Sequence, residues 1–591
     1  MATGPETDVF PTGKHRTSSY LRRFGISSAV AHLALCIGTA VLLTLAFPRP
    51  GWSFMAHFAL VPAGVLVMRT TSLRRLAWTS YLVFFLWWML RLLWLREVSP
   101  IAPVGTALVM GGYFSLTLVA LAAVQRRFRG TMTATLPVFW CAQEALRSRF
   151  PWGGFGWFNL SASQANWRVG QPAGLLVQNA DLFGELTVSF LIGMTSGLLV
   201  DLIARPISKR GARGRLRPRR TIVVAALVWG GLILSALLYG RHRIQQAQAL
   251  LADGPTITVI QTNVPQDNKV SSTPEQRAER EDELFVLSEQ AVRDHPDTAL
   301  IVWPETMAPY PVNPEWLTGQ RFYVNDNSVA LDQRIQQFTS DWGVSLLVGS
   351  PSLLVDPGTG TISEKNSAVY YPPEGRYPNT YSKRYLVPFG EFVPGPGPLR
   401  SLFLRFTPRD PTTGEIIDYS IRPGEATVIY PVPTLEDEGT DLRVVTPICY
   451  EDAVGPYCLD LVYAPGGEKR ADLMVNLTND AWYAGTVQGY QHLQIATLRC
   501  IETRTPMARS VNTGVSGFID SLGRVEELVQ IDGQHQEIAG SASRRIRIDP
   551  RTSPYARTRQ GLAVGVCAMS LLLLLGTLVP HRSERQSKKL K

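Results

Sequence analysis

The sequence predicts a multi-domain protein with a polytopic α-helical membrane domain of about eight helices and a separate α/β domain. Two observations carry this prediction. Eight apolar runs, seven of them in the first 241 residues, approach the length that crosses a bilayer, and from residue 256 onward short β-type runs alternate with helix-type stretches. With 591 residues, 45% of them hydrophobic, the chain has ample material for both parts.

The apolar runs define the predicted membrane helices, because a bilayer core about 30 Å thick needs about 20 apolar residues in a helix. In chain order the runs cover residues 25–47, 52–68, 76–95, 102–125, 131–146, 183–204, 221–240 and 561–579. The first run is too long for a signal-peptide core, and no small-residue cleavage site follows it, so we interpret it as a spanning helix. The runs 52–68 and 131–146 are short, and tilted or interfacial helices are open alternatives for them.

The net charge of +10 is concentrated in short segments between the apolar runs. Residues 1–23, 69–75, 126–129, 205–220 and 582–591 hold 23 of the 58 Lys and Arg, so the rest of the chain is net negative. This distribution argues against a nucleic-acid-binding protein. If the N-terminus is cytoplasmic, the basic linkers follow the second, fourth, sixth and eighth helices, and the positive-inside rule then places the α/β domain outside the cytoplasm.

These patterns predict four regions of the chain. Residues 1–24 form a cytoplasmic tail, and residues 25–241 form a membrane domain with seven transmembrane helices. Residues 242–555 form an extracytoplasmic domain, and residues 556–591 form a C-terminal transmembrane helix with a basic cytoplasmic tail. The protein is therefore expected in a membrane as a multi-pass chain.

The extracytoplasmic domain shows alternating β-type and helix-type segments, which is typical of layered α/β proteins. The β-type runs are residues 256–261, 300–303, 344–349, 368–371, 443–447, 473–477 and 516–519. Helix-type stretches include residues 273–295 and 488–504.

Three segments of this domain are notable because a reactive side chain is expected to end or follow a hydrophobic strand. Glu305 follows Trp303 and Pro304, and a carboxylate next to a buried strand can act as a general base. Lys383 offers a cation that could stabilise an oxyanion. Cys449 offers a thiol whose pKa a nearby Lys lowers and whose proton a nearby Glu accepts. Together the three groups can perform acyl transfer through a thioester.

Each group also has a plainer interpretation. A lone Cys after a strand is commonly inert packing, and Cys449 could instead pair with Cys458 or Cys500 in an oxidising compartment. Lys383 could be a solvated surface charge. The combination of the three groups, rather than any one of them, favours an enzyme.

In this order, the three residues closely resemble the Glu–Lys–Cys triad of the nitrilase superfamily, whose members fold as an αββα sandwich. With membrane helices before and after that domain, the chain resembles the bacterial apolipoprotein N-acyltransferases of this superfamily. Most of the chain takes part in the resemblance. The similar segments are residues 144–147 (Glu-Ala-Leu-Arg), 150–152 (Phe-Pro-Trp), 259–266, 303–305 (Trp-Pro-Glu), 386–391, 449–451 (Cys-Tyr-Glu) and 479–482 (Asn-Asp-Ala-Trp).

The resemblance implies a role for each matching residue. Cys449 corresponds to the nucleophile, Glu305 to the general base and Lys383 to the oxyanion-stabilising cation. Glu391, Tyr450 and Glu451 correspond to family residues that support the site. Glu144 and Arg147, which could pair with each other, correspond to residues that could support it from the membrane domain.

The chain departs from the family pattern at two positions. Val270 follows Lys269 where the family usually has Trp, and Tyr385 stands where it often has His. The triad residues themselves are unaffected.

The resemblance also implies a reaction and a location. A fatty acyl chain passes from a membrane phospholipid to Cys449, and then to the α-amino group of the N-terminal diacylglyceryl-cysteine of a lipoprotein, without a cofactor or metal. The protein is expected as a monomer in the bacterial inner membrane, with its catalytic domain on the periplasmic side. Two alternatives are a membrane-anchored amidase that gives the acyl group to water, and a transporter or receptor, although no paired repeats are present.

Overall fold

The computed structural model describes residues 26, 28–205, 208–210, 216–218, 220–266, 272–319, 326–355, 358–377, 379–405, 407, 414, 416, 418–434 and 441–579. The predicted tail at residues 1–24, the basic end at residues 582–591 and Val270 lie outside the described residues. Within the basic linker at residues 205–220, residues 206, 207, 211–215 and 219 also lie outside them, and the described part includes a two-stranded pair formed by β1 (Ser208–Arg210) and β2 (Leu216–Pro218).

All eight apolar runs are helical in the structure. They form α2 (Ala29–Ala46), α3 (Ala56–Ala59) with α4 (Val61–Arg69), α5 (Leu73–Arg91), α6 (Ala102–Phe128), α7 (Met132–Arg147), α9 (Leu186–Ala204), α10 (Arg220–Leu250) and α19 (Gly561–Leu578). Among the described residues, α2, α6, α9, α10 and α19 are long and apolar enough to cross a membrane. The second run is broken into two short helices and α7 has 16 residues, so a count of eight spans stays a prediction.

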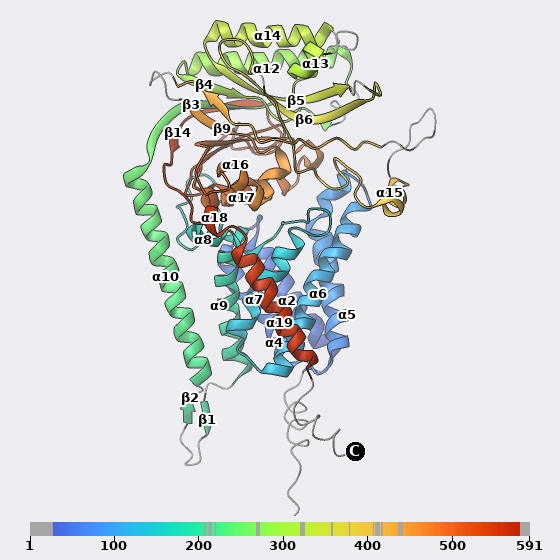
Figure 1. Ribbon diagram of the computed structural model, residues 1–591. Helices are drawn as coiled ribbons and strands as arrows, with labels where there is room; N and C mark the ends of the chain where they lie inside the picture. Colours follow the sequence, from blue (N-terminus) through green and yellow to red (C-terminus); the bar gives the residue numbers. More distant parts are fainter. Residues whose placement is uncertain are drawn as a thin grey trace, which may run out of the picture.

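The helices form a bundle below the α/β domain, and α10 stands along one side of it (Figure 1). Small and hydroxyl-bearing residues let the helices approach one another, as is typical of membrane helices. For example, Ser80 of α5 donates a hydrogen bond to Ser115 of α6. Helix α10 continues through the predicted domain boundary at residue 241 and ends at Leu250, directly before the first strand of the α/β domain.

The α/β domain contains two six-stranded sheets. The first sheet has the order β14-β3-β4-β5-β6-β7, with β3 (Ala252–Gln261), β4 (Thr298–Val302), β5 (Ser345–Val355), β6 (Ile362–Tyr371), β7 (Tyr381–Ser382) and β14 (Gly540–Ile548). The second has the order β13-β12-β11-β10-β9-β8, with β8 (Tyr430–Val432), β9 (Leu442–Val445), β10 (Leu473–Thr478), β11 (Met507–Val511), β12 (Gly517–Ile519) and β13 (Val525–Leu528). The central strands β3, β4 and β5 run parallel, as do β9, β10 and β11, and the strands outside them pair antiparallel.

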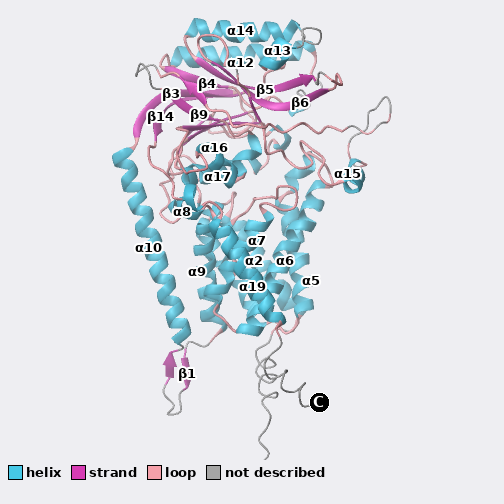
Figure 2. Ribbon diagram, in the orientation of Figure 1, coloured by secondary structure: helices cyan, strands magenta, loops and turns pink. Residues whose placement is uncertain are grey.

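Helices cover the outer face of each sheet, which gives four layers (Figures 1 and 2). The outer layer over the first sheet consists of α12 (Pro274–Asp294), α13 (Pro314–Gly319) and α14 (Asp326–Trp342). The layer between the second sheet and the membrane helices contains α16 (Gly455–Val462) and α17 (Gln488–Thr503), with the short helices α8 (Ala180–Phe183) and α18 (Tyr555–Thr558) at the junction. Helix α15 (Gly397–Leu404) lies at the side of this junction.

Alternation along the strands divides the apolar side chains between two cores. On β3, Ile257 and Val259 pack in the core that both sheets share, whereas Ile260 faces the α12 and α14 layer. The fold is therefore the predicted αββα arrangement. The seven β-type runs of the sequence fall in β3, β4, β5, β6, β9, β10 and β12, and the two helix-type stretches form α12 and α17.

Candidate active site

The three predicted catalytic residues follow the carboxyl ends of strands from both sheets. Glu305 lies in the loop after β4, Lys383 directly follows β7, and Cys449 lies shortly after β9. Lys383 Nζ lies 3.4 Å from Glu305 Oε1. The charges of Glu305 and Lys383 both act on the Cys449 thiol. The fold therefore brings together residues that are up to 144 positions apart in the sequence.

Glu305 is buried and held by two donors from other segments. Its Oε2 accepts a hydrogen bond from the backbone N–H of Asn479 at 2.7 Å, and its Oε1 accepts one from Asn366 Nδ2 at 2.5 Å. Gly349 on β5 lets the loop with Pro304 and Glu305 pass close to this strand, because a Cβ on residue 349 would lie 2.0 Å from the carbonyl oxygen of Pro304. The carboxylate is thus fixed in one orientation next to Lys383.

Lys383 is buried between two carboxylates. Its Nζ donates to Glu391 Oε1 at 2.7 Å, and Val387 N–H binds the other oxygen of Glu391 at 2.8 Å. Burial alone would lower the pKa of Lys383, but Glu391 and Glu305 raise it well above its ordinary value. Lys383 is therefore a permanent cation and not a solvated surface charge.

Cys449 begins a short 3-10 helix, η5 (Cys449–Ala453), in a left-handed backbone conformation with φ of 49°. This conformation is uncommon outside glycine and is typical of strained functional positions. Burial and the charge of Glu305 raise the pKa of the thiol well above its ordinary value, and Lys383 lowers it by less. Lys383 thus lowers the pKa of Cys449 as expected, but desolvation and the charge of Glu305 outweigh this effect, so the net shift is upward.

All six cysteines are free thiols, so Cys449 forms no disulfide with Cys458 or Cys500. The two partners considered from the sequence are buried in the core of the α/β domain. Cys449 is half-buried.

Glu451 is a buried hub that joins the segment after Lys383 to the segment around Cys449. One oxygen accepts hydrogen bonds from the backbone N–H groups of Arg384 and Tyr385, at 2.7 and 3.0 Å. The other accepts from Ile448 N–H at 2.8 Å and from the Tyr381 hydroxyl at 2.7 Å. Burial raises the pKa of Glu451, against the effect of these donors.

Tyr450 connects the site to the loop after α7 in the membrane part. Its hydroxyl donates to the Gly154 carbonyl oxygen at 3.1 Å, and its ring stacks on Trp157 with centroids 6.0 Å apart. Tyr385 makes a similar contact, since its hydroxyl donates to the Gly153 carbonyl oxygen at 2.6 Å. Tyr385, one of the two positions that depart from the family pattern, thus forms a second link between the two parts.

Glu144 and Arg147 are both buried, but they do not form the ion pair expected from the sequence. Glu144 Oε1 accepts hydrogen bonds from Trp140 Nε1 and Leu160 N–H. Arg147 instead donates to the carbonyl oxygens of Phe155 and Trp157 and to Asn159. Each side chain thus binds residues of the loop after α7, the loop that contacts Tyr450.

Two amide residues of the site had weak signals in the sequence. Asn479 belongs to a segment that resembles the family, but its contribution is a backbone N–H, which no residue type reveals. Asn366 lies in the middle of β6, where nothing in the sequence distinguishes it from a structural residue. In the part of the chain that the structure describes, no cluster of three or more His, Cys, Asp or Glu could hold a metal.

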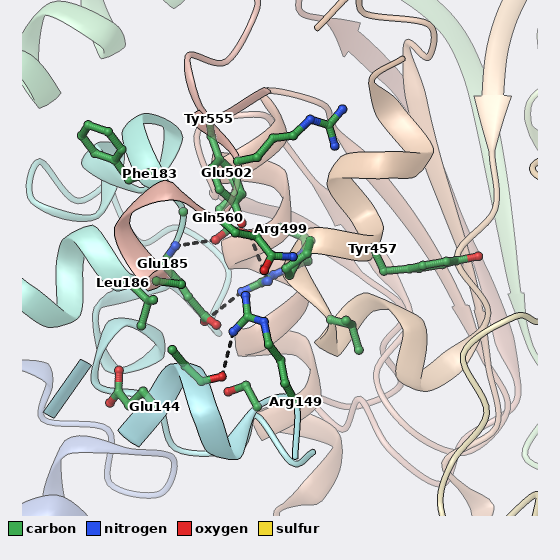
Figure 3. A pocket seen from close by; sticks show the side chains of 18 of the residues that line it. Glu144, Arg149, Phe183, Glu185, Leu186, Tyr457, Arg499, Glu502, Tyr555 and Gln560 are labelled. Carbon is green, nitrogen blue, oxygen red and sulfur yellow. Dashed lines mark hydrogen bonds and ion pairs between the residues drawn. The ribbon is translucent and has the colours of Figure 1, made fainter. Parts of the chain in front are cut away.

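A cavity of about 320 Å³ lies beside this site, between the ends of α7, α8 and α19 on one side and α16 and α17 on the other. Figure 3 shows Arg499 within it, paired with Glu185 at 3.0 Å. Tyr385 lines the cavity, whereas Glu305, Lys383 and Cys449 do not. The cavity is therefore a feature of the junction, separate from the candidate catalytic groups.

Comparison with known proteins identifies both parts of the chain. Residues 39–198 match the family described as apolipoprotein N-acyltransferase N-terminal domain, and residues 256–537 match the carbon-nitrogen hydrolase family. The chain is 26% identical to apolipoprotein N-acyltransferase 1 of Treponema denticola, over 84% of this chain and 88% of that protein. It is 30% identical to apolipoprotein N-acyltransferase of Methylococcus capsulatus, over 73% of this chain and 71% of that protein.

Among solved structures, the chain is similar to Saccharomyces cerevisiae Nit3, a member of the nitrilase superfamily, with 16% identity and a TM-score of 0.33. The match covers 52% of this chain and 94% of Nit3. The family matches and the identity to the curated relatives cover most of the sequence, including the membrane part and the domain with Glu305, Lys383 and Cys449. The chain therefore belongs to the apolipoprotein N-acyltransferase family.

Proposed function

We propose that this protein transfers a fatty acyl chain from a membrane phospholipid to the α-amino group of an N-terminal diacylglyceryl-cysteine, through a thioester on Cys449. The observation that carries the proposal is the buried group of charges beside the thiol. Lys383 Nζ lies 3.4 Å from Glu305 and 2.7 Å from Glu391, and both triad charges act on Cys449. A base, a fixed cation and a nucleophile are the groups that acyl transfer requires.

In the first step, the thiol of Cys449 attacks the carbonyl carbon of the phospholipid ester while Glu305 accepts the thiol proton. Because the resting thiol keeps its proton, transfer to Glu305 must accompany the attack. Lys383 stabilises the oxyanion that forms. The ester C–O bond then breaks, Glu305 returns the proton to the leaving oxygen, and a lysophospholipid departs.

In the second step, the amine of the acceptor attacks the thioester carbonyl. Glu305 accepts a proton from the amine, Lys383 again stabilises the oxyanion, and the C–S bond breaks as an amide forms. The proton passes from Glu305 to the sulfur, which restores the starting thiol. Glu391, Tyr450 and Glu451 support these steps by holding Lys383 and the segments on each side of Cys449 in place.

The attachment of the catalytic domain to membrane helices suits lipid substrates. Each buried CH₂ group contributes about 0.8 kcal/mol to membrane binding, so extracting an acyl chain of some sixteen carbons costs on the order of 12 kcal/mol. An active site beside the bundle avoids this cost. The contacts of Tyr385 and Tyr450 with the loop after α7 keep it there.

We further propose that the catalytic domain lies on the periplasmic side of the inner membrane of a bacterium, with the chain crossing the membrane eight times. The basic linkers support this orientation, since they meet at the end of the bundle far from the α/β domain. Arg126 donates to the Thr70 carbonyl oxygen and Arg205 to the Gly130 carbonyl oxygen. Such a basic end is typical of the cytoplasmic side. We expect a monomer whose partners are lipids and lipoproteins, and not nucleic acid.

The proposal predicts the effect of Cys449→Ala in a strain that depends on this copy of the protein. Lipoproteins should remain diacylated, and mass spectrometry of their N-terminal peptides measures this directly. The matched control is Cys567→Ala, which removes a half-buried thiol on α19 and should leave lipoproteins triacylated.

A second measurement identifies the class of reaction. The purified protein mixed with phospholipid alone should gain one acyl mass on the peptide that contains Cys449. Triacylated lipoproteins in the Cys449→Ala strain would contradict the proposal. Release of free fatty acid without acylation of a diacylglyceryl peptide would instead indicate the hydrolase alternative.

A further inference from the structure

A buried histidine joins the two segments that hold the nucleophile and the base. His492, on α17, places Nε2 at 2.7 Å from Asp452 Oδ1 and Nδ1 at 3.2 Å from Asp480 Oδ1. Asp452 lies three residues after Cys449, within η5. Asp480 adjoins Asn479, whose backbone N–H donates to Glu305.

The bridge requires a protonated imidazole. A neutral imidazole has one N–H and can donate to one carboxylate, whereas the imidazolium donates from both nitrogens. The same two carboxylates have few other donors. Arg509 on β11 donates to the second oxygen of Asp452, and Gln488 Nε2 lies 3.2 Å from Asp480 Oδ1.

The charges of this cluster balance only when His492 is charged. Asp452, Asp480, His492 and Arg509 are all buried, and together they give two negative and two positive groups. Burial alone would lower the pKa of His492, but Asp452 and Asp480 raise it to about 9, with Arg509 acting in the opposite direction. On the membrane side, the uncharged ring of Trp157 packs against the imidazole with centroids 5.9 Å apart.

We propose that His492 is a positioning residue of the acyl-transfer reaction. As an imidazolium it connects the Cys449 segment, through Asp452, to the loop with Asn479 and Asp480, whose backbone binds Glu305. The inference rests on the proposed function. Loss of the proton breaks the hydrogen bond from His492 to one of the two Asp residues and leaves one buried negative charge uncompensated. Asp480 already raises the pKa of the Cys449 thiol, so this loss makes the thiol harder to activate.

The test is the rate of acylation of the Cys449 peptide by phospholipid, followed by mass spectrometry in single turnovers between pH 6 and 10. The wild-type rate should fall at alkaline pH with a midpoint near pH 9, the pKa of His492. Asp480→Asn removes one of the two charges that raise this pKa, so its midpoint should shift to lower pH by about one unit. His492→Gln should lose this alkaline fall and react about tenfold more slowly at pH 7, the effect of one pKa unit on the thiol.

The matched control is His535→Gln, which changes a half-buried histidine whose Nδ1 lies 3.1 Å from the Val529 carbonyl oxygen. This variant should keep the wild-type rate and midpoint. A histidine with a merely structural role would slow the reaction equally at every pH. An unshifted midpoint in Asp480→Asn would therefore overturn the proposal, and so would full activity at pH 7 in His492→Gln.

Alkylation by iodoacetamide separates failure of the bridge from failure of the proposed function, because it needs no lipid. At pH 7.5 the ratio of Cys449 to Cys567 alkylation should be about tenfold lower in His492→Gln than in wild type. If no variant, including wild type, acquires an acyl group, the proposed function fails and the alkylation ratio still tests the bridge. If His492→Gln does not fold, the midpoint of Asp480→Asn decides.

Discussion

Asn366 shows how one neutral side chain organises a site of several charges. Its Nδ2 group donates to Glu305 Oε1 at 2.5 Å and lies 3.3 Å from Glu391 Oε1. Two carboxylates that share the ammonium of Lys383 would repel each other without a donor between them. The amide therefore supplies a donor between Glu305 and Glu391, which lets the two carboxylates lie close together.

Asn366→Asp tests this arrangement with almost no change in shape. The variant replaces a donor with a third carboxylate around a single ammonium, so the base and the cation should both be mispositioned. We expect acylation of the Cys449 peptide by phospholipid to slow at least about tenfold, as a shift of one pKa unit would produce. The matched control is Asn379→Asp, an exposed position, which should acylate at the wild-type rate. Equal rates in the two variants would show that Asn366 has no such role.

The sequence could nominate the candidate catalytic residues, and the structure places Lys383 3.4 Å from Glu305, but the direction of the pKa shift of Cys449 could not be predicted. Glu305 and Cys449 each follow a hydrophobic run, and Lys383 precedes a segment that resembles the family, all of which can be seen in the sequence. The pKa of the Cys449 thiol depends on how completely the folded chain excludes water from it, and on the distances to Glu305 and Lys383. The sequence contains neither quantity.

At the scale of elements, the close packing of α7 against α9 depends on glycine. A Cβ at Gly197 of α9 would lie 2.3 Å from the Met132 carbonyl oxygen at the start of α7. Near the same end of the two helices, Asp201 accepts hydrogen bonds from the backbone and the side chain of Thr133. The obstacle is backbone, which cannot rotate away as a side chain could.

Gly197→Ala should therefore separate the two helices. Overpacking of this kind typically costs about 1–3 kcal/mol. Gly112→Ala on α6 is the matched control, because a Cβ there has no atom within 4 Å, and we expect a change within about 1 kcal/mol. Thermal unfolding in detergent compares the two variants, and equal midpoints would contradict the role of Gly197.

Strands with continuous apolar runs could be predicted from the sequence, and strands with interspersed charges could not. Strand β14 contains Arg544, Arg545 and Arg547, and β11 contains the buried Arg509, whose charge is balanced by Asp452 on another segment. Such strands are stable because of partners that only the tertiary structure supplies. For the same reason the sequence suggested an ion pair between Glu144 and Arg147 that the structure does not form.

At the scale of the whole molecule, Asp181 joins three parts of the chain. One oxygen of its carboxylate accepts hydrogen bonds from Arg243 of α10 and from Arg504 at the end of α17, each at 2.8 Å. The other accepts one from the Tyr239 hydroxyl at 2.8 Å. Asp181, Arg243 and Arg504 are buried, so one carboxylate compensates two guanidinium groups where α10 meets the catalytic domain.

Asp181→Asn should destabilise the protein strongly, because it leaves two buried cations without their counter-charge. Removing one partner from a buried ion pair typically costs about 3–5 kcal/mol. Denaturant unfolding in detergent measures the loss. The matched control is Glu289→Gln, which removes an exposed ion pair with Arg293 and should change the stability by at most about 1 kcal/mol. A loss no larger in Asp181→Asn than in the control would contradict the importance of this junction.

The apolar interior of the bundle does not stop where the catalytic domain begins. Tyr450, Ile495 and Leu498 of the catalytic domain pack in the same continuous core as Leu43 of α2 and Phe114 of α6. Two regions that match separate sequence families thus share one buried apolar core. A substitution deep inside the helical bundle can consequently disturb Tyr450, the residue next to Cys449, without changing any of the candidate catalytic groups.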